Sequence, residues 1–378
     1  MLESSPIYLD YNATTPLLPQ VLEAMQPWLA GIPANANSAH HYGKRARMAV
    51  ERAREQVAAL LGAQPGEIVF THSATSAIQL AMQVALEARQ TRHTAWLRSA
   101  TEHSAVMHAM QSNGAGLSEV VMPVDAHGMI SHEALEPVLS DRMLLAALHL
   151  ANAETGTVLP IAALAALARS KGVLMFTDAT QAVGKIPVDV GQIGVDLLAM
   201  SGHKLHGPQG IGALFVSRTS KLPVLRNLKA AELAGGTLST AAIVGFGEAC
   251  AQAKQYLAGQ SNQLVQLRQQ LLHTLQAGTS IHLNGHPTQC LPNTLNVWFE
   301  GIEATLLLEA LQTSLAASTG SACNAARKAP SHVLKAMGFA PERIHGSVRF
   351  SFGRSTTAAE VESACEHIAA ACAQLRID

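Results

Sequence analysis

A lysine, Lys204, directly follows an apolar segment at residues 197–200 that has the character of a buried β-strand. A turn rich in glycine and proline comes next, and a second apolar run covers residues 211–216. Lysine is normally a solvated surface residue. In an apolar pocket its amine loses its proton more readily and can form a Schiff base with a carbonyl compound. The alternative is a lysine that extends from a strand end to water, and this segment alone leaves both open.

Polar side chains also follow other predicted strands. Asp178 ends the apolar strand at residues 173–177, and its carboxylate is suited to pair with a protonated ring nitrogen. His103 lies in a turn after the strand at residues 95–97, where it can stack on a ring or transfer protons. Each residue also has an ordinary structural explanation, Asp178 as a turn cap and His103 as a hydrogen-bonded histidine. Their joint occurrence at strand ends is much harder to explain by chance.

A hydroxyl-rich turn at residues 71–76 separates a predicted strand from a predicted helix. The unpaired N–H groups of a helix N-terminus can bind an anion, although a plain Ser/Thr cap explains the same turn. Thr75, Ser201 and His203 are the candidates to hold a phosphate. Pyridoxal phosphate requires this combination of a Schiff-base lysine, an acid at its ring nitrogen and a phosphate cup.

The predicted elements place these residues on one sheet edge. Strands alternate with helices between residues 67 and 216, which predicts a doubly wound, mostly parallel α/β domain. Such sheets bind ligands at the carboxyl ends of their strands. A smaller α+β region follows residue 250, with a helical stretch at 252–277, strands at 294–299 and 348–351, and a closing helix at 358–375. We expect a large domain at 15–250 and a small domain formed by 1–14 and 251–378.

The composition excludes several classes of function. The chain has 378 residues, 48% of them hydrophobic and 14% charged, and its 26 basic and 27 acidic residues give a net charge of −1. No Lys/Arg cluster indicates binding to nucleic acid or to an anionic membrane. No apolar run approaches the roughly 18 residues that span a bilayer, and the N-terminal residues do not have the pattern of a signal peptide. We therefore expect a cytoplasmic enzyme.

The chain has five cysteines, an odd number without the paired spacing of a metal site, so we expect free thiols and no metal. Cys323 lies in a loop of small residues, and the nearby Arg327 and Lys328 favour its thiolate form. It is the candidate reactive cysteine. Three of the others are better explained as inert core residues: Cys250, Cys365 and Cys372.

These motifs resemble those of the class V, fold type I pyridoxal-phosphate enzymes, and most closely the cysteine desulfurases of the iron–sulfur-cluster type. The Asp-Ala-x-Gln motif at 178–181 and the Ser-x-His-Lys motif at 201–204 are specific for the cofactor. The Ser-Ala-Cys loop, with six residues between Cys323 and Pro330, is typical of the long-loop group. The resemblance extends through residues 8–16, 35–43, 101–106, 154–156, 177–189, 201–216, 236–249, 318–338 and 348–354.

The resemblance implies a role for each matching position around the cofactor. Lys204 would hold it as a Schiff base, Asp178 would contact the pyridine nitrogen, Gln181 the ring hydroxyl, and His103 would stack on the ring. The phosphate would be bound by Ala74, Thr75, Ser201 and His203.

The resemblance also implies a substrate and a partner subunit. Thr237 would reach the phosphate of the neighbouring subunit, which makes the active unit a homodimer. Arg349 would bind the carboxylate of L-cysteine, and its planar guanidinium suits that role. Cys323 would accept the sulfur as a persulfide, leaving L-alanine, before passing it to an acceptor that the sequence does not name. The alternatives are a selenocysteine lyase, another β-eliminating enzyme, or a cofactor-binding paralogue with little turnover.

Three segments depart from the family pattern. Residues 227–235 lack its glycine-rich character and its arginine, which would reshape the substrate entrance and the dimer contact. The helix after Thr75 continues with residues 76–78, Ser-Ala-Ile, where the family has Glu and Asn residues. Ala153 stands where an asparagine is expected near the ring hydroxyl and the substrate.

Overall fold

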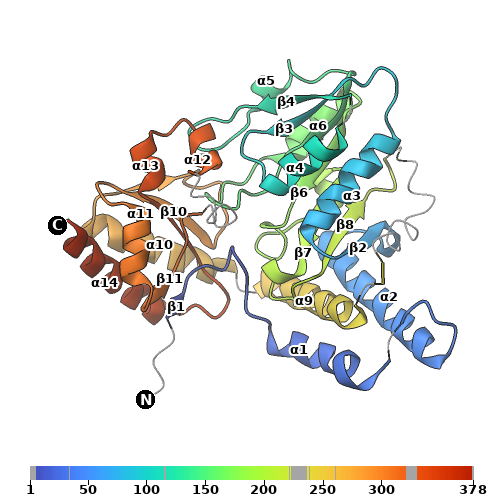
Figure 1. Ribbon diagram of the computed structural model, residues 1–378, viewed down its shortest axis with the longest axis horizontal. Helices are drawn as coiled ribbons and strands as arrows, with labels where there is room; N and C mark the ends of the chain where they lie inside the picture. Colours follow the sequence, from blue (N-terminus) through green and yellow to red (C-terminus); the bar gives the residue numbers. More distant parts are fainter. Residues whose placement is uncertain are drawn as a thin grey trace.

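The computed structural model describes residues 6–33, 35–114, 116–220, 222, 236–237, 239–259, 261–320 and 330–376. Figure 1 shows two lobes, the larger on the right with a central sheet and the smaller on the left. The larger sheet has seven strands in the order β2-β8-β7-β6-β5-β3-β4. These strands are β2 (Ile68–Thr71), β3 (Ala95–Ser99), β4 (Ser118–Met122), β5 (Met143–Ala147), β6 (Leu174–Asp178), β7 (Leu197–Ser201) and β8 (Gly212–Val216).

The predicted α/β fold with a mostly parallel sheet is confirmed. Strands β3 to β7 pair in parallel with one another, whereas β8 runs antiparallel to both β2 and β7. The reversal follows from the connection between β7 and β8, which is the short turn that carries Lys204. A parallel return would require a crossover of a dozen or more residues, usually a helix.

Side chains of β7 alternate between the two faces of this sheet, as the two-residue period of a strand dictates. Leu198 and Met200 pack with residues of α1 (Pro19–Gln26), α2 (His41–Leu61), α6 (Ile161–Ser170) and α9 (Thr240–Gly259). Leu197 and Ala199 pack on the opposite face with residues of α3 (Ala74–Glu87) and α4 (Ser104–Asn113). Helices on both faces leave the strand ends as the exposed polar edge.

Shorter helical segments complete the larger lobe. Gly62 is the C-cap of α2 with φ of 66°, a left-handed conformation that favours glycine. The remaining segments are η1 (Pro27–Gly31), η2 (Pro65–Glu67), α5 (His132–Leu135), α7 (Val190–Ile193) and η3 (Gly202–Lys204).

The smaller lobe is built on an antiparallel sheet in the order β12-β10-β9. Its strands are β9 (Ile281–Asn284), β10 (Thr294–Phe299) and β12 (Ser347–Ser351), and its helices are α10 (Ser261–Gly278), α11 (Ala304–Leu311), α12 (His332–Ala336), α13 (Pro341–His345) and α14 (Ala358–Leu375). The predicted helical stretch at 252–277 is divided between α9 and α10. A glycine, Gly259, is the last residue of α9.

The N-terminal segment belongs to the core of the smaller lobe. Leu9 is buried in the hydrophobic cluster of that lobe, and β1 (Ile7–Tyr8) pairs in parallel with β11 (Leu315–Ala316). The polar turn at residues 10–16 then crosses toward the larger lobe, where Thr15 N donates to the carbonyl of His203. Among the residues that the structure describes, no helix is both long enough and apolar enough to span a bilayer.

Candidate active site

A cavity of about 430 Å³ opens at the strand ends of the larger sheet, against β12 of the smaller lobe. Predicted site residues from both lobes line it: Ala74, Thr75, His103, Asp178, Gln181, Ser201, His203, Lys204 and Arg349. The cavity therefore brings together predicted site residues that lie up to 275 positions apart in the chain. Strand-end positions on one sheet edge meet in this way because the strands are parallel.

Lys204 lies in η3, immediately after β7, and its side chain is partly buried. Its Nζ donates to the carbonyl oxygens of Asn12 and Ala13, at 2.6 Å in both cases. The Asn12 carbonyl also accepts a hydrogen bond from Gln181 Nε2 at 3.0 Å. The amine of Lys204 and the amide of Gln181 thus converge on one backbone oxygen at the cavity wall.

Asp178 is the last residue of β6 and is 7% exposed. Its Oδ1 accepts a hydrogen bond from Thr180 N at 2.9 Å, which fixes the carboxylate at the strand end. His103 is the N-cap of α4, and its Nδ1 accepts from Ala105 N at 3.1 Å. A neutral imidazole with Nδ1 as acceptor carries its proton on Nε2. His103 is exposed toward solvent and lines the cavity, so Nε2 is placed to exchange that proton.

The first turn of α3 forms the predicted anion site. Ser73 is the N-cap, and its Oγ accepts from Ser76 N at 3.1 Å. Ala74 and Thr75 begin the helix at the cavity, where main-chain N–H groups favour an anion. Gly212 on β8 packs against this turn, because a Cβ there would lie 2.6 Å from the carbonyl carbon of Ser73 and 2.8 Å from Ala74 N.

Two further predicted phosphate-binding residues line the same cavity, Ser201 and His203. Ser201 ends β7 and is buried at the cavity wall. His203 Nδ1 lies 3.1 Å from Thr14 Oγ1. Burial, together with the positive charges of Lys204 and Lys185, lowers the pKa of His203 to about 4. His203 is therefore neutral near pH 7 and retains one N–H for an anionic ligand.

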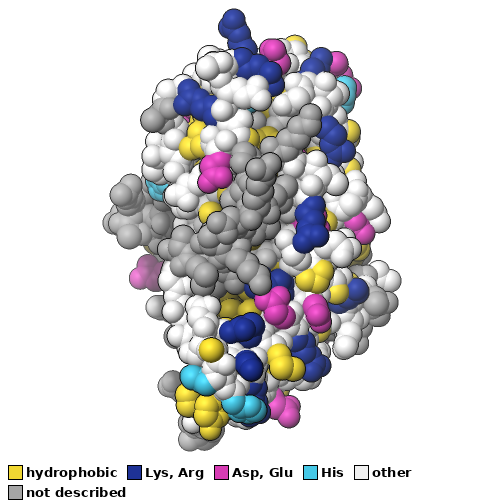
Figure 2. Space-filling view, turned by 90° about the vertical axis from the view of Figure 1, so that its right-hand side faces the viewer, with side chains coloured by type: hydrophobic (Ala, Val, Ile, Leu, Met, Phe, Trp, Pro, Cys, Tyr) yellow, Lys and Arg dark blue, Asp and Glu magenta, His cyan; other side chains and the backbone are white. Residues whose placement is uncertain are grey.

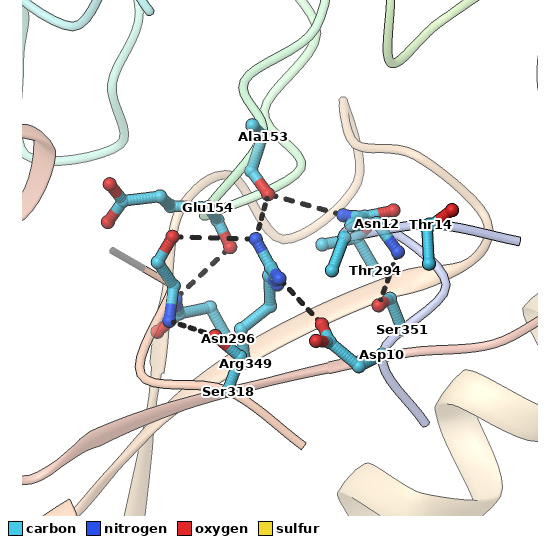
Figure 3. Close-up of polar contacts among 12 residues, drawn as sticks. Asp10, Asn12, Thr14, Ala153, Glu154, Thr294, Asn296, Ser318, Arg349 and Ser351 are labelled. Carbon is cyan, nitrogen blue, oxygen red and sulfur yellow. Dashed lines mark hydrogen bonds and ion pairs between the residues drawn. The ribbon is translucent and has the colours of Figure 1, made fainter. Parts of the chain in front are cut away.

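Arg349 enters the cavity from β12 and is only 3% exposed (Figure 3). Its Nη2 lies 2.6 Å from Asp10 Oδ1, and its Nη1 donates to the carbonyl of Ala153 at 3.1 Å. Its Nε is buried without a hydrogen-bond partner among the described residues. A buried guanidinium with an unsatisfied donor is suited to bind a carboxylate in a planar, two-pronged geometry.

Ala153, the departure from the family pattern, lines the cavity as expected. Its carbonyl oxygen accepts hydrogen bonds from Asn12 Nδ2 at 3.2 Å and from Arg349 Nη1 (Figure 3). The backbone of this position therefore supports two site residues, whereas its methyl side chain offers the cavity no polar group. The neighbouring Asn152 is buried and caps the turn by accepting from Glu154 N and Thr155 N.

The structure adds site residues that the sequence analysis did not select. Asn12 lines the cavity and accepts a hydrogen bond from the buried Lys185, and Asp10 forms an ion pair with Arg349. The sequence could have indicated all three residues. Asp10 and Asn12 lie in the segment at 8–16 that carries the family resemblance, and Lys185 follows Gln181 by four residues.

A second missed group lies beside His103. Glu102 is fully buried, and its Oε1 accepts from His149 N at 2.7 Å and lies 3.0 Å from His149 Nδ1. Glu154 is also buried, accepts from the Ser331 hydroxyl at 2.5 Å, and has its pKa raised by burial. Glu102, His149 and Glu154 all line the cavity, so its wall contains more titratable groups than the motifs indicate.

Two predicted site residues are not among the lining residues. Cys323 lies outside the described residues, as does the segment at 227–235. Thr237 is exposed in the single chain. The remaining cysteines are free thiols whose pKa is raised by burial, to about 11 for Cys372, and Cys250 and Cys365 are buried as well. None of these four has the environment of a reactive thiolate.

A mostly parallel α/β lobe with a lysine, an aspartate and a helix N-terminus at its strand ends defines a fold type I pyridoxal-phosphate enzyme. The chain matches the aminotransferase class-V family over residues 7–363 and belongs to it. It is 40% identical over 379 aligned positions to the cysteine desulfurase IscS of Proteus mirabilis, an alignment that covers 98% of this chain and 94% of that protein. Within the class-V family, the chain is thus a member of the cysteine desulfurases, which are pyridoxal-phosphate enzymes.

Two solved structures are also similar. A NifS-like protein superposes with a TM-score of 0.89 at 30% identity, covering 98% of this chain and 100% of that chain. The structure of SspA in complex with cysteine superposes with a TM-score of 0.78 at 32% identity, covering 91% and 98% of the two chains. The resemblance predicted from the motifs is confirmed by these relatives.

Proposed function

We propose that this chain is a pyridoxal-phosphate-dependent cysteine desulfurase that converts L-cysteine to L-alanine and transfers the sulfur to Cys323 as a persulfide. The observation that carries the proposal is the convergence of Lys204, Asp178 and Arg349 on one cavity. An amine nucleophile, an acid and a carboxylate-binding guanidinium are the groups that a cofactor and an amino-acid substrate need together. The similarity to a protein solved with cysteine supports the choice of substrate.

The residues present fit the cofactor. The cavity of about 430 Å³ lies within the usual range for small-molecule sites. Its donor set complements each part of pyridoxal phosphate, with Lys204 for the carbonyl, Asp178 for the ring nitrogen and the first turn of α3 for the phosphate. Bound through Lys204, the cofactor would supply an electrophilic Schiff-base carbon, at which the substrate amine can replace the lysine amine, and a ring that accepts electrons.

The protein's own groups then have distinct tasks. Asp178, held by Thr180 N, would keep a proton on the ring nitrogen. Ala74, Thr75 and Ser201 would bind the phosphate, and the neutral His203 would donate its remaining N–H to it. His103 would stack on the ring and transfer protons through Nε2, since its Nδ1 already accepts a backbone hydrogen bond.

The substrate side of the cavity has its own binding group. Arg349 would bind the cysteine carboxylate with the donors that Asp10 and Ala153 leave available. Lys204 would take the α-proton of the substrate. The Cβ–S bond of the substrate would then break as its sulfur bonds to Cys323 Sγ, which leaves alanine after reprotonation.

We also propose that the active unit is a homodimer and that each chain has a large domain at 15–250 and a small domain at 1–14 with 251–378. Separate hydrophobic clusters in the two lobes support the division. Exposed apolar side chains on α1, η1 and α2 support the dimer: Leu22, Leu29, Tyr42 and Met48. Thr237, exposed in the single chain, would contact the cofactor phosphate of the partner subunit.

One face of the molecule carries mixed charge outside the part that is not described. Figure 2 shows the face on the right of Figure 1, where dark blue Lys and Arg side chains are interspersed with magenta Asp and Glu. Apolar and histidine side chains gather at the lower end of this face. A nucleic-acid partner would instead favour a contiguous basic surface.

Cofactor attachment is the first test. Purified protein loaded with pyridoxal phosphate should have a visible absorption band, and reduction with borohydride should leave the cofactor mass on the peptide that contains Lys204. The Lys204→Ala variant should show neither signal, while Lys254→Ala, which removes a lysine on α9, should show both. Attachment at a different lysine would contradict the proposal.

Ala153 favours a second candidate, a selenocysteine lyase or another β-eliminating enzyme, because the reacting centre lacks a polar side chain at that position. Rates on cysteine, selenocysteine and cysteine sulfinate separate the two functions. A desulfurase uses cysteine best and needs Cys323, whereas a lyase prefers the selenium substrate and retains its rate in Cys323→Ala.

A further inference from the structure

A second lysine, Lys185, lies fully inside the protein beneath the candidate cofactor site. Only 8% of the residue is exposed, and its Nζ donates to Asn12 Oδ1 at 2.9 Å and to Gln181 Oε1 at 2.5 Å. The charged groups that act on it most strongly are two cations, Lys204 and Arg349. Burial of a lysine among cations is unfavourable, so a lysine at this position requires an explanation beyond packing.

The hydrogen bonds of Lys185 do not depend on its charge. Burial, Lys204 and Arg349 hold its pKa well below the ordinary value for lysine. A lysine Nζ has three N–H groups when charged and two when neutral, which suffices for both oxygen acceptors in either state. Lys185 also acts on two histidines, His203 and His206, whose pKa values are both lowered to about 4, so neither adds a positive charge near pH 7. The cavity wall further contains the imidazole of His103 and the carboxyl groups of Asp178 and Glu154.

These contacts fix the side-chain amide of Gln181 at both ends. Its Oε1 faces the Lys185 donor, and its Nε2 donates to the carbonyl oxygen of Asn12 at 3.0 Å. If the side-chain amide of Gln181 were rotated by 180°, its Oε1 would face the carbonyl oxygen of Asn12, and its NH₂ group would face Lys185 Nζ. Both ends therefore select the same orientation, with the NH₂ group on the side of the Lys204 amine, which donates to the same carbonyl at 2.6 Å.

We propose that Lys185 is a positioning residue that orients Gln181 so that its amide presents NH₂, rather than its carbonyl oxygen, to the ring hydroxyl of the cofactor. The inference rests on the proposed function, since it assigns Gln181 to that hydroxyl. A donor at the ring oxygen stabilises negative charge there, whereas a rotated amide would oppose it. With Lys185 present, the Schiff base that Lys204 forms with the cofactor would therefore lose its proton at a lower pH than it would without Lys185.

The test is a pH titration of the visible absorption of the cofactor-loaded protein, with Lys185→Met as the variant because Met retains the length of the side chain without its N–H groups. We expect the titration midpoint to rise by about one pH unit, and Gln181→Leu to raise it by a similar amount. The affinity of the apoprotein for pyridoxal phosphate should fall about tenfold in both variants.

The double variant separates positioning from a direct effect of charge. If Lys185 acts through Gln181, Lys185→Met should cause no further shift in the Gln181→Leu background. Lys185→Gln, which restores a neutral donor, should recover most of the wild-type midpoint. Lys185→Leu, which also lacks a donor, provides the measurement if Lys185→Met does not fold. A shift of the same size in both backgrounds, or no recovery in Lys185→Gln, would overturn the inference. A wild-type protein without a visible band would instead contradict the proposed function.

Discussion

Arg349 and Asp10 form an ion pair at the wall of the candidate substrate cavity, with 2.6 Å between Nη2 and Oδ1. The two residues are 339 positions apart, and an isolated bridge between Asp10 and Ser351 brings the N-terminal segment alongside β12. Asp10 therefore fixes one arm of the guanidinium, while its buried Nε has no hydrogen-bond partner in the described part of the chain. The substrate carboxylate would meet an arginine that is already oriented.

This arrangement predicts a binding defect when Asp10 is lost. Asp10→Ala should raise KM for cysteine about tenfold and change kcat much less, because Arg349 loses the partner that orients it. Asp10→Asn keeps an oxygen acceptor and should show a smaller effect. Steady-state alanine formation measures both constants. An unchanged KM in Asp10→Ala would show that Arg349 does not need this ion pair.

Replacing Gly212, which packs against the predicted phosphate-binding turn, should weaken cofactor binding although this glycine itself touches no ligand. Gly212→Ala would place a methyl group 2.6 Å from the carbonyl carbon of Ser73 and displace the first turn of α3. We expect the dissociation constant for pyridoxal phosphate to increase about tenfold or more. Gly278→Ala is the matched control, since no atom of the described residues lies within 4 Å of its added Cβ. Equal affinities in the two variants would contradict the role given to this contact.

Replacing Asp178 should slow the reaction while the cofactor stays attached to Lys204. Asp178→Asn cannot keep a proton on the ring nitrogen, so kcat should fall by about 10² or more. Lys204 is unchanged, and the visible band should persist. Alanine formation together with the absorption spectrum checks this expectation, which would be wrong if the variant turned over at the wild-type rate.

His206 predicts how the stability of the protein depends on pH. Burial lowers the pKa of His206 from 6.5 to about 4. The charges of Arg354 and Lys185 lower this pKa further, whereas the hydrogen bond to the Pro16 carbonyl raises it. Between these values the unfolded chain binds a proton that the folded chain does not. The free energy of unfolding should therefore fall as the pH decreases from about 6.5 toward about 4, and His203 adds the same trend.

His206→Asn should reduce this pH dependence without altering the backbone. The residue has φ of 66°, which asparagine tolerates better than most residues. Urea unfolding of the apoprotein at about pH 7.5 and about pH 5 measures the difference in stability. The variant should lose less stability on acidification than the wild type, and an identical loss would rule out His206 as a source.

Much of the fold and the centre of the site follow from local sequence pattern. Asp178 and Lys204 lie at the ends of strands, as the sequence predicts, because apolar runs mark buried strands and the ends of parallel strands share an edge. Thr75 followed from a hydroxyl-rich turn before a helix. The short turn after Ser201 could also have indicated that β8 is antiparallel, since it is too short for a helical crossover.

The remaining contacts depend on chain crossings that no local pattern encodes. Asn12 receives a hydrogen bond from Lys185, 173 positions away, only because the N-terminal turn crosses from the smaller lobe to the larger sheet. The ion pair of Arg349 with Asp10 depends on the same crossing. Side-chain pairs of this kind follow from tertiary packing, whereas strand-end residues follow from secondary structure.

The central claim is that this chain moves sulfur from L-cysteine to Cys323, and one measurement tests it directly. Cofactor-loaded wild type, Cys323→Ala and Cys290→Ala are incubated with L-cysteine, and alanine and the masses of the cysteine peptides are determined together. Wild type and Cys290→Ala should form alanine and carry an extra sulfur atom on the Cys323 peptide, while Cys323→Ala should form neither persulfide nor alanine at a comparable rate. Full alanine formation by Cys323→Ala, or a persulfide on another cysteine, would contradict the claim.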